Sequence, residues 1–221
     1  MLATQFKKFH EFALSIVLLE TSRTTQNMKP GKRFIDKSDL PEPRLWRRDT
    51  KAIVGSILLA VAFAANMQIA ERIDTATVGG IIPWSGTMFA RIWFTSAGVF
   101  FGLTGALIVA SFNPVIAILT STGPLAPFHI FTNWTFSIPF TLLVHQLIRR
   151  NRGLHMIPFV LLVVSCALVA GLTLFLLWIN VFKFSWSQSM TLYVWYVFMS
   201  LPGSILAFHF IRGVSRSGVV S

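Results

Sequence analysis

Long runs of apolar residues, separated by short polar or charged segments, make up most of the chain after residue 50. Several runs approach about twenty residues, the length that an α-helix needs to cross the hydrocarbon core of a bilayer. The first fifty residues are instead mostly polar and contain many Lys and Arg side chains. This pattern predicts an all-α polytopic membrane domain at residues 51–212. It also predicts an amphipathic or disordered, basic cytoplasmic extension at 1–50 and a cytoplasmic tail at 213–221.

The stretch from Trp84 to Leu119 decides how many helices cross the membrane, because it has room for one tilted helix or two short ones. Basic clusters mark the cytoplasmic side of membrane proteins. A single helix here would place Arg149, Arg150 and Arg152 outside, whereas two helices with a turn near Gly102 to Gly105 place every basic cluster inside. We therefore predict six transmembrane helices with both termini in the cytoplasm, at residues 51–69, 84–101, 103–120, 128–148, 154–181 and 190–211.

The composition changes the picture mainly through what it lacks. No Asp or Glu occurs from Thr75 to Ser221. The whole chain is 54% hydrophobic and has a net charge of +11. Carboxylate acid/base catalysis and carboxylate metal sites need such residues inside the fold, so we expect no enzyme and no cofactor. The basic residues lie in the extension or beside apolar runs, and the aromatic residues lie within those runs, which argues against nucleic acid as a partner.

Four histidines raise the alternative of a metal site, a haem site or a membrane enzyme: His129, His145, His155 and His209. The last three fall near the predicted cytoplasmic ends of helices and His129 falls at the opposite side, so no two form an evident ligand pair. We therefore predict no metal site. A membrane-embedded enzyme that uses His129 or His145 is the weakest of the functional classes considered.

Small residues recur every four positions along the first predicted helix, at Ala52, Ser56, Ala60 and Ala64. Such a stripe lies on one helical face and lets a second helix approach closely. Two interpretations stay open. The stripe either packs against another helix of the same chain or docks a partner protein.

Polar and aromatic residues gather at the predicted outer ends of the later helices, where they could bind a small molecule. Amides and neutral rings suit a planar heterocycle, and a cationic ring would gain cation–π attraction there. An interfacial aromatic belt is the alternative for these rings. Arg91 is the single charge within its predicted helix, and it either reaches the interface or recognises an anion. The candidate binding residues are Arg91, Asn113, His129, Asn133, Trp134, Trp178, Asn180, Trp195 and Tyr196.

Taken together, the six predicted helices, the small-residue stripe and the segment from Trp84 to Gly123 give the chain a family resemblance. That segment would form two short helices and a loop rich in Pro and small polar residues. The chain resembles the substrate-binding S component of an energy-coupling factor (ECF) vitamin transporter, and is most similar to the hydroxymethylpyrimidine/thiamine type. The loop residues that carry this similarity are Asn113, Pro114, Ser121, Thr122, Gly123 and Pro124.

The resemblance implies a multi-pass protein of the cell membrane whose partners are the lipid bilayer, an ECF coupling subunit and ATPase subunits. It implies capture of a vitamin-like ligand near the outer face, with docking of the coupling subunit through the stripe at Ala52, Ser56, Ala60 and Ala64. Residues 1–50 are longer than the corresponding part of that family. The alternative function is a non-catalytic accessory or scaffold subunit of a membrane enzyme complex.

Overall fold

The computed structural model of the chain describes residues 34–78, 84–120, 126–151 and 153–217. Predictions for residues 1–33, for the loop residues Ser121 to Pro124 and for Arg152 therefore lie outside the described residues.

The described part of the chain is almost entirely helical, as the apolar runs predict. The described part outside helices consists of connecting segments, such as residues 40–49, and two three-residue strands that pair with each other. The elements in chain order are β1 (Phe34–Asp36), η1 (Lys37–Asp39), α2 (Thr50–Val78), α3 (Trp84–Thr120), α4 (Ala126–Arg150), β2 (Gly153–His155), α5 (Met156–Asn180) and α6 (Trp186–Arg216).

Four of the described helical stretches are long and apolar enough to cross a membrane: Thr50–Thr77, Trp84–Ile116, Met156–Asn180 and Trp186–Arg216. These make the chain a candidate membrane protein whose helices are compatible with contact to lipid. The helix α4, which was predicted as a span at 128–148, is not among the four. Polar side chains such as Thr132, Asn133 and Gln146 are spread along α4 and lower its mean hydropathy.

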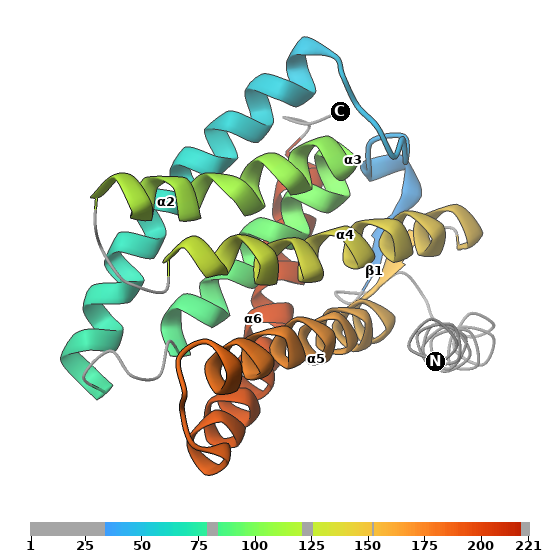
Figure 1. Cartoon of the computed structure of the whole chain (residues 1–221). Helices are drawn as coiled ribbons and strands as arrows, with labels where there is room; N and C mark the ends of the chain where they lie inside the picture. Colours follow the sequence, from blue (N-terminus) through green and yellow to red (C-terminus); the bar gives the residue numbers. More distant parts are fainter. Residues whose placement is uncertain (1–33, 79–83, 121–125, 152, 218–221) are drawn as a thin grey trace.

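The backbone of α3 is broken at Gly102, which adopts non-helical φ and ψ angles of 66° and −155°. Figure 1 shows that α3 changes direction, so that its two halves form separate arms of the fold. The turn lies at the start of the predicted interval Gly102 to Gly105. Only glycine fits this place, because a Cβ atom there would lie 2.5 Å from the carbonyl oxygen of Leu45 and 2.6 Å from that of Arg44.

The helices α3, α4, α5 and α6 form a closed ring. In this ring α3 packs on α4, α4 on α5, α5 on α6, and α6 returns to α3, while α2 packs on the outside of α3. The helices α2 and α3 run alongside each other in Figure 1. A residue on the inner side of α3 can therefore touch both α4 and α6, and this arrangement positions the candidate site.

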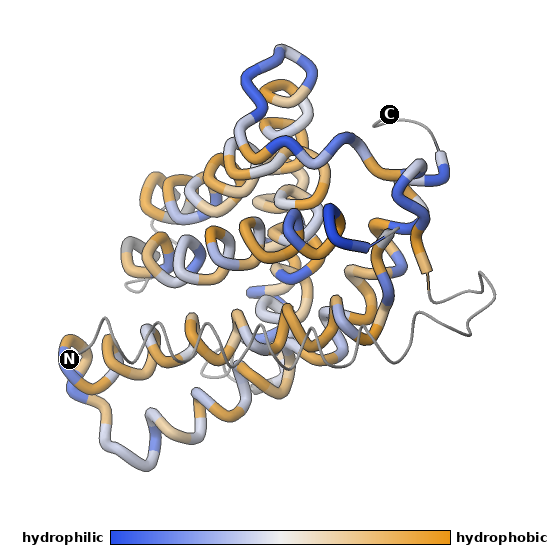
Figure 2. Tube along the Cα trace, turned by 90° about the vertical axis from the view of Figure 1, so that its right-hand side faces the viewer, coloured by the Kyte–Doolittle hydropathy of each residue, from blue (hydrophilic) through white to orange (hydrophobic). Residues whose placement is uncertain are grey.

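Residues 34–49, which belong to the predicted basic extension, make specific contacts with the rest of the fold. Strand β1 pairs antiparallel with β2, with Ile35 opposite Leu154. Nη1 of Arg47 donates a hydrogen bond to the carbonyl oxygen of Phe100 at 2.8 Å, and Nη2 of Arg149 donates to that of Pro43 at 2.8 Å. Figure 2 shows that hydrophobic residues dominate the helices, while several of the segments that connect them are hydrophilic. The segment thus holds the Gly102 turn and the end of α4 together.

The small-residue stripe of α2 is buried within the chain. Ala52, Ser56 and Ala60 are fully buried, Ala64 is nearly so, and α2 packs mainly on α3. Phe101 and Gly105 of α3 approach this region closely: a Cβ on Gly105 would lie 2.9 Å from Oγ of Ser56. The structure therefore shows the first of the two interpretations, internal packing. In this conformation the stripe does not offer a face to a partner.

Candidate functional site

The side chain of Arg91 is buried inside the ring of helices, with only 1% of its surface exposed. Its Nε atom donates a hydrogen bond to Oγ of Ser200 on α6 at 3.0 Å. The guanidinium carbon lies 4.2 Å from the ring centre of Phe136 on α4 and 4.6 Å from that of Tyr196 on α6. Arg91 therefore joins α3 to both α4 and α6. Its guanidinium is therefore enclosed by the helices and does not reach the surface of the protein.

The positive charge of Arg91 has no carboxylate partner among the described residues. The ion pairs found there join Arg44 to Glu42 and Arg47 to Asp49, both in the segment before α2. Arginine stays protonated in proteins, and removing a lone ion from water costs several kcal/mol. Two aromatic faces and one hydroxyl offset part of this cost. Within the described residues, Nη2 of Arg91 has no hydrogen-bond partner at all.

The buried carboxylate of Asp74 does not serve Arg91. Its two oxygens accept hydrogen bonds from the backbone N–H groups of Ser85 at 2.9 Å and Gly86 at 3.2 Å. Those groups belong to the first turn of α3, where N–H groups have no partner within the helix and the helix dipole favours a negative charge. Asp74 therefore links the end of α2 to the start of α3, and its negative charge is stabilised by the N-terminus of α3.

The surroundings of Arg91 differ in the two directions along the ring. Toward the Gly102 turn, the interior is filled by phenylalanine rings whose centres lie 5.7–5.8 Å apart, in the series Phe136, Phe140, Phe159 and Phe208. Toward the other end lies a smaller cluster built on Leu174, Trp178 and Leu192, against which Tyr196 also packs. Arg91 thus lies where the dense phenylalanine core ends.

Three of the other predicted binding residues, Tyr196, Trp178 and Asn113, also lie in the interior of the fold. Tyr196 is brought together with Arg91, as described above. Trp178 is buried in the smaller cluster beside it. Asn113 is buried in the second arm of α3, and its side-chain oxygen has no partner among the described residues.

Asn133 and Trp134 connect α4 to the second arm of α3. Nδ2 of Asn133 donates to the carbonyl oxygen of Ala110 at 3.0 Å, and Nε1 of Trp134 donates to Oγ of Ser111 at 2.9 Å. One N–H of the Asn133 amide and the indole N–H of Trp134 therefore already hold α4 to α3. His129, one turn earlier on α4, is partly buried.

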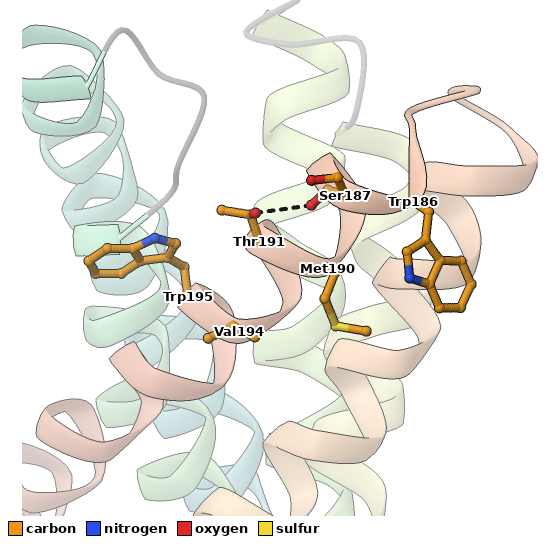
Figure 3. A pocket seen from close by; sticks show the side chains of 6 residues that line it. All are labelled: Trp186, Ser187, Met190, Thr191, Val194 and Trp195. Atoms are coloured by element: carbon orange, nitrogen blue, oxygen red, sulfur yellow. Dashed lines mark hydrogen bonds between the residues drawn. The ribbon is translucent and has the colours of Figure 1, made fainter.

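Trp195 and Asn180 do not join the interior group. Trp195 is 39% exposed. Together with Trp186 it flanks a shallow surface hollow of about 470 Å³ on α6, whose lining also includes Ser187, Met190, Thr191 and Val194. Figure 3 shows the two indole rings on opposite sides of this hollow. Nδ2 of Asn180 bonds to the carbonyl oxygen of Leu176 in its own helix.

Phe136 and Ser200 were not predicted as neighbours of Arg91. Nothing in the sequence sets Phe136 apart among 21 phenylalanines. Ser200 lies 109 positions from Arg91, so only the closure of the ring brings the two together. A small polar residue four positions after Tyr196, on the same helical face, was the one signal that the sequence offered.

Metal binding finds no support in the part of the chain that the structure describes, where no three His, Cys, Asp or Glu side chains are grouped to hold an ion. His145 lies 2.9 Å from the carbonyl oxygen of Gly98 through Nε2, so it ties α4 to α3. No family model, curated protein or solved structure matches the chain.

Proposed function

We propose that this chain is the substrate-binding membrane subunit of an uptake transporter of the ECF type, which captures a vitamin or vitamin precursor at the outer membrane face. The observation that carries the proposal is the buried guanidinium of Arg91, held between Phe136 and Tyr196 with one terminal nitrogen unused. A cation inside a membrane domain is costly, and such residues mark binding sites and transport paths. No three His, Cys, Asp or Glu side chains of the described residues are grouped so that they could hold a metal ion.

The proposal includes six crossings with both ends of the chain in the cytoplasm. The two arms of α3 on either side of Gly102 would cross separately, since an arm of about eighteen residues spans about 27 Å, close to the hydrocarbon thickness of about 30 Å. Contacts of residues 34–49 with the Gly102 turn and with Arg149 support this arrangement. They gather Arg47, Arg149 and the turn at one end of the fold, which agrees with the positive-inside rule.

Docking to a coupling subunit needs a surface other than the buried stripe of α2. The opposite face of that helix exposes Val54, Leu58 and Val61, which suit either lipid or a partner helix. In a transporter of this type the ATP hydrolysis takes place in the partner subunits. The function of this chain is then binding alone, in keeping with the lack of carboxylates after Asp74.

A scaffold subunit of a membrane enzyme complex is the second candidate. The observation that favours it is the exposure of large apolar side chains along α5 and α6, among them Leu172, Leu176 and Phe198. A neighbouring membrane subunit could cover these side chains. The buried, unpaired Arg91 has no role in that account.

Co-purification separates the two candidates. The tagged full chain, extracted in mild detergent from its own cells, is expected to carry ATPase subunits and a membrane coupling protein, and cells lacking the chain are expected to lose uptake of one vitamin. A stoichiometric complex with an oxidoreductase, together with unchanged uptake of every vitamin tested, would establish the scaffold function instead.

A further inference from the structure

We propose that Arg91 anchors a small monocarboxylate with an apolar or aromatic body, and this inference rests on the binding function proposed above. The carboxylate would accept a hydrogen bond from Nη2 of Arg91, the terminal nitrogen that has no partner among the described residues. The site thus takes a weak organic acid. It would not take a cation of the thiamine kind.

The charge of the ligand follows from the charge of the site. Arg91 is a buried cation without a described counter-ion, so a negative group cancels an electrostatic cost that the protein otherwise carries. A cationic ligand would add to that cost. The aromatic faces that would attract it, Phe136 and Tyr196, are already in contact with the guanidinium.

The number of charges follows from the donors within reach. The described contacts of the guanidinium are one hydroxyl and two rings, with no second cation. A single guanidinium neutralises one negative charge, whereas a phosphate dianion would leave a second charge buried and uncompensated. A carboxylate also matches the planar geometry of guanidinium N–H groups.

Two buried hydroxyls indicate on which side the body of the ligand lies. Oγ1 of Thr132 and Oγ of Ser189 are both buried and both without a hydrogen-bond partner among the described residues. Thr132 lies one helical turn before Phe136 on α4, and Ser189 lies two turns before Tyr196 on α6. Folded proteins leave few buried polar groups unsatisfied. These two therefore extend the site from Arg91 toward the ends where α4 and α6 begin.

The opposite direction is closed. The rings of Phe136, Phe140 and Phe159 follow one another toward the Gly102 turn at centre distances of 5.8 Å. The smaller cluster of Leu174, Trp178 and Leu192 offers apolar walls on the side of the two hydroxyls. A ligand with a carboxylate at one end and an apolar body with one or two polar atoms fits this distribution.

Matched pairs of an acid and its amide test the inference on the purified full chain in detergent. The probes are benzoate with benzamide, nicotinate with nicotinamide, and hexanoate with hexanamide, followed by tryptophan fluorescence and by the unfolding temperature. At least one acid is expected to bind and to raise the unfolding temperature, with its amide about ten- to a hundredfold weaker. Equal binding of acid and amide in every pair, or no binding of any acid at millimolar concentration, would overturn the proposal.

Substitution then locates the site. Arg91→Met is expected to remove the preference for the acid, and Arg72→Met, the same change at an exposed arginine of α2, is expected to keep it. Arg91→Lys retains the charge and serves if Arg91→Met does not fold. It is expected to bind the acid more weakly while still preferring it to the amide. Unchanged acid binding in both Arg91 variants would contradict the assignment.

The outcomes also separate this inference from the proposed function. Acid binding at Arg91 in a chain that co-purifies with no ATPase subunits would retain the site and remove the transporter. Uptake of a neutral or cationic vitamin, with no acid bound by the purified chain, would retain the transporter and remove the carboxylate site.

Discussion

Individual carboxylates in this protein cap helices, and none of the described ones compensates the buried arginine. Oδ1 of Asp49 accepts a hydrogen bond from the backbone N–H of Ala52 at 2.9 Å, and this bond lowers the pKa of the Asp49 carboxyl. Asp74 accepts two such bonds from the first turn of α3. The acidic side chains before α2 and within it thus fix where α2 and α3 begin.

Replacement of Asp74 by Ala is expected to lower the free energy of unfolding by about 1–3 kcal/mol, because two buried N–H groups lose their acceptor. Thermal unfolding in detergent measures the change. Thr75→Ala is the control, since this neighbouring side chain is exposed and its hydroxyl bonds only within α2. Equal stability of the two variants would show that the cap contributes nothing measurable.

Residue types in the sequence identify Arg91 and Tyr196 as notable, but they cannot show that the two meet. Intramembrane arginines are rare enough to draw attention from one sequence. Their partners depend on how the ring closes, and Ser200 is 109 positions away. The same holds for Asn133 and Trp134, which the sequence predicted as binding residues. The sequence does not show that both side chains donate hydrogen bonds to α3.

Among the elements, α3 carries the most consequential local feature, its break at Gly102. Substitution by Ala is expected to cost about 1–3 kcal/mol for the backbone conformation alone, with further cost from overlap with Leu45 and Arg44. Gly213→Ala is the matched control: a methyl group at that position would meet nothing within 4 Å, and helix propensity favours Ala by about 1 kcal/mol. Unfolding temperatures should move in opposite directions. A fall for both, or for neither, would contradict the account.

The packing of α2 on α3 can be tested at one position of the stripe. Ala60→Leu is expected to destabilise the fold by about 1–3 kcal/mol, because Ala60 is fully buried and a larger side chain there would have to displace its neighbours. Ala62→Leu, two positions on at an exposed site of the same helix, should leave the unfolding temperature nearly unchanged. If Ala60→Leu folded as well as the control and lost only a partner subunit, the stripe would be a docking surface after all.

Helices were more predictable than the segments between them. Length and hydropathy predict most of the ends of α2, α5 and α6 to within about five residues of the observed ends. The exception is the C-terminal end of α2, which continues to Val78 beyond the predicted end at 69. The fold of residues 34–49 could not be predicted, because β1 pairs with three residues that follow Arg152. A three-residue strand has too few positions to show an alternating pattern, and its pairing is a tertiary contact.

At the scale of the whole molecule, the ring of α3, α4, α5 and α6 and the doubling back of α3 depend on each other. Gly102 lies against residues 44–46, with Leu103 N–H bonded to the carbonyl oxygen of Leu45 at 2.8 Å. That contact places the turn beside the basic segment, and the two arms of α3 then extend from it. If α3 crossed the membrane only once, Gly102 in its middle would lie inside the bilayer. The basic segment at residues 44–46, which contacts Gly102, would then lie inside the bilayer as well.

Cysteine labelling tests the double crossing most directly. The buried lone Cys166 is first replaced by Ser, and single cysteines are then introduced at Thr75, Leu119 or Ser38, all of them exposed. With a membrane-impermeant maleimide on intact cells, the account predicts labelling at Thr75 and at Leu119, and labelling at Ser38 only after permeabilisation. Thr75 and Leu119 on opposite sides of the membrane would contradict it.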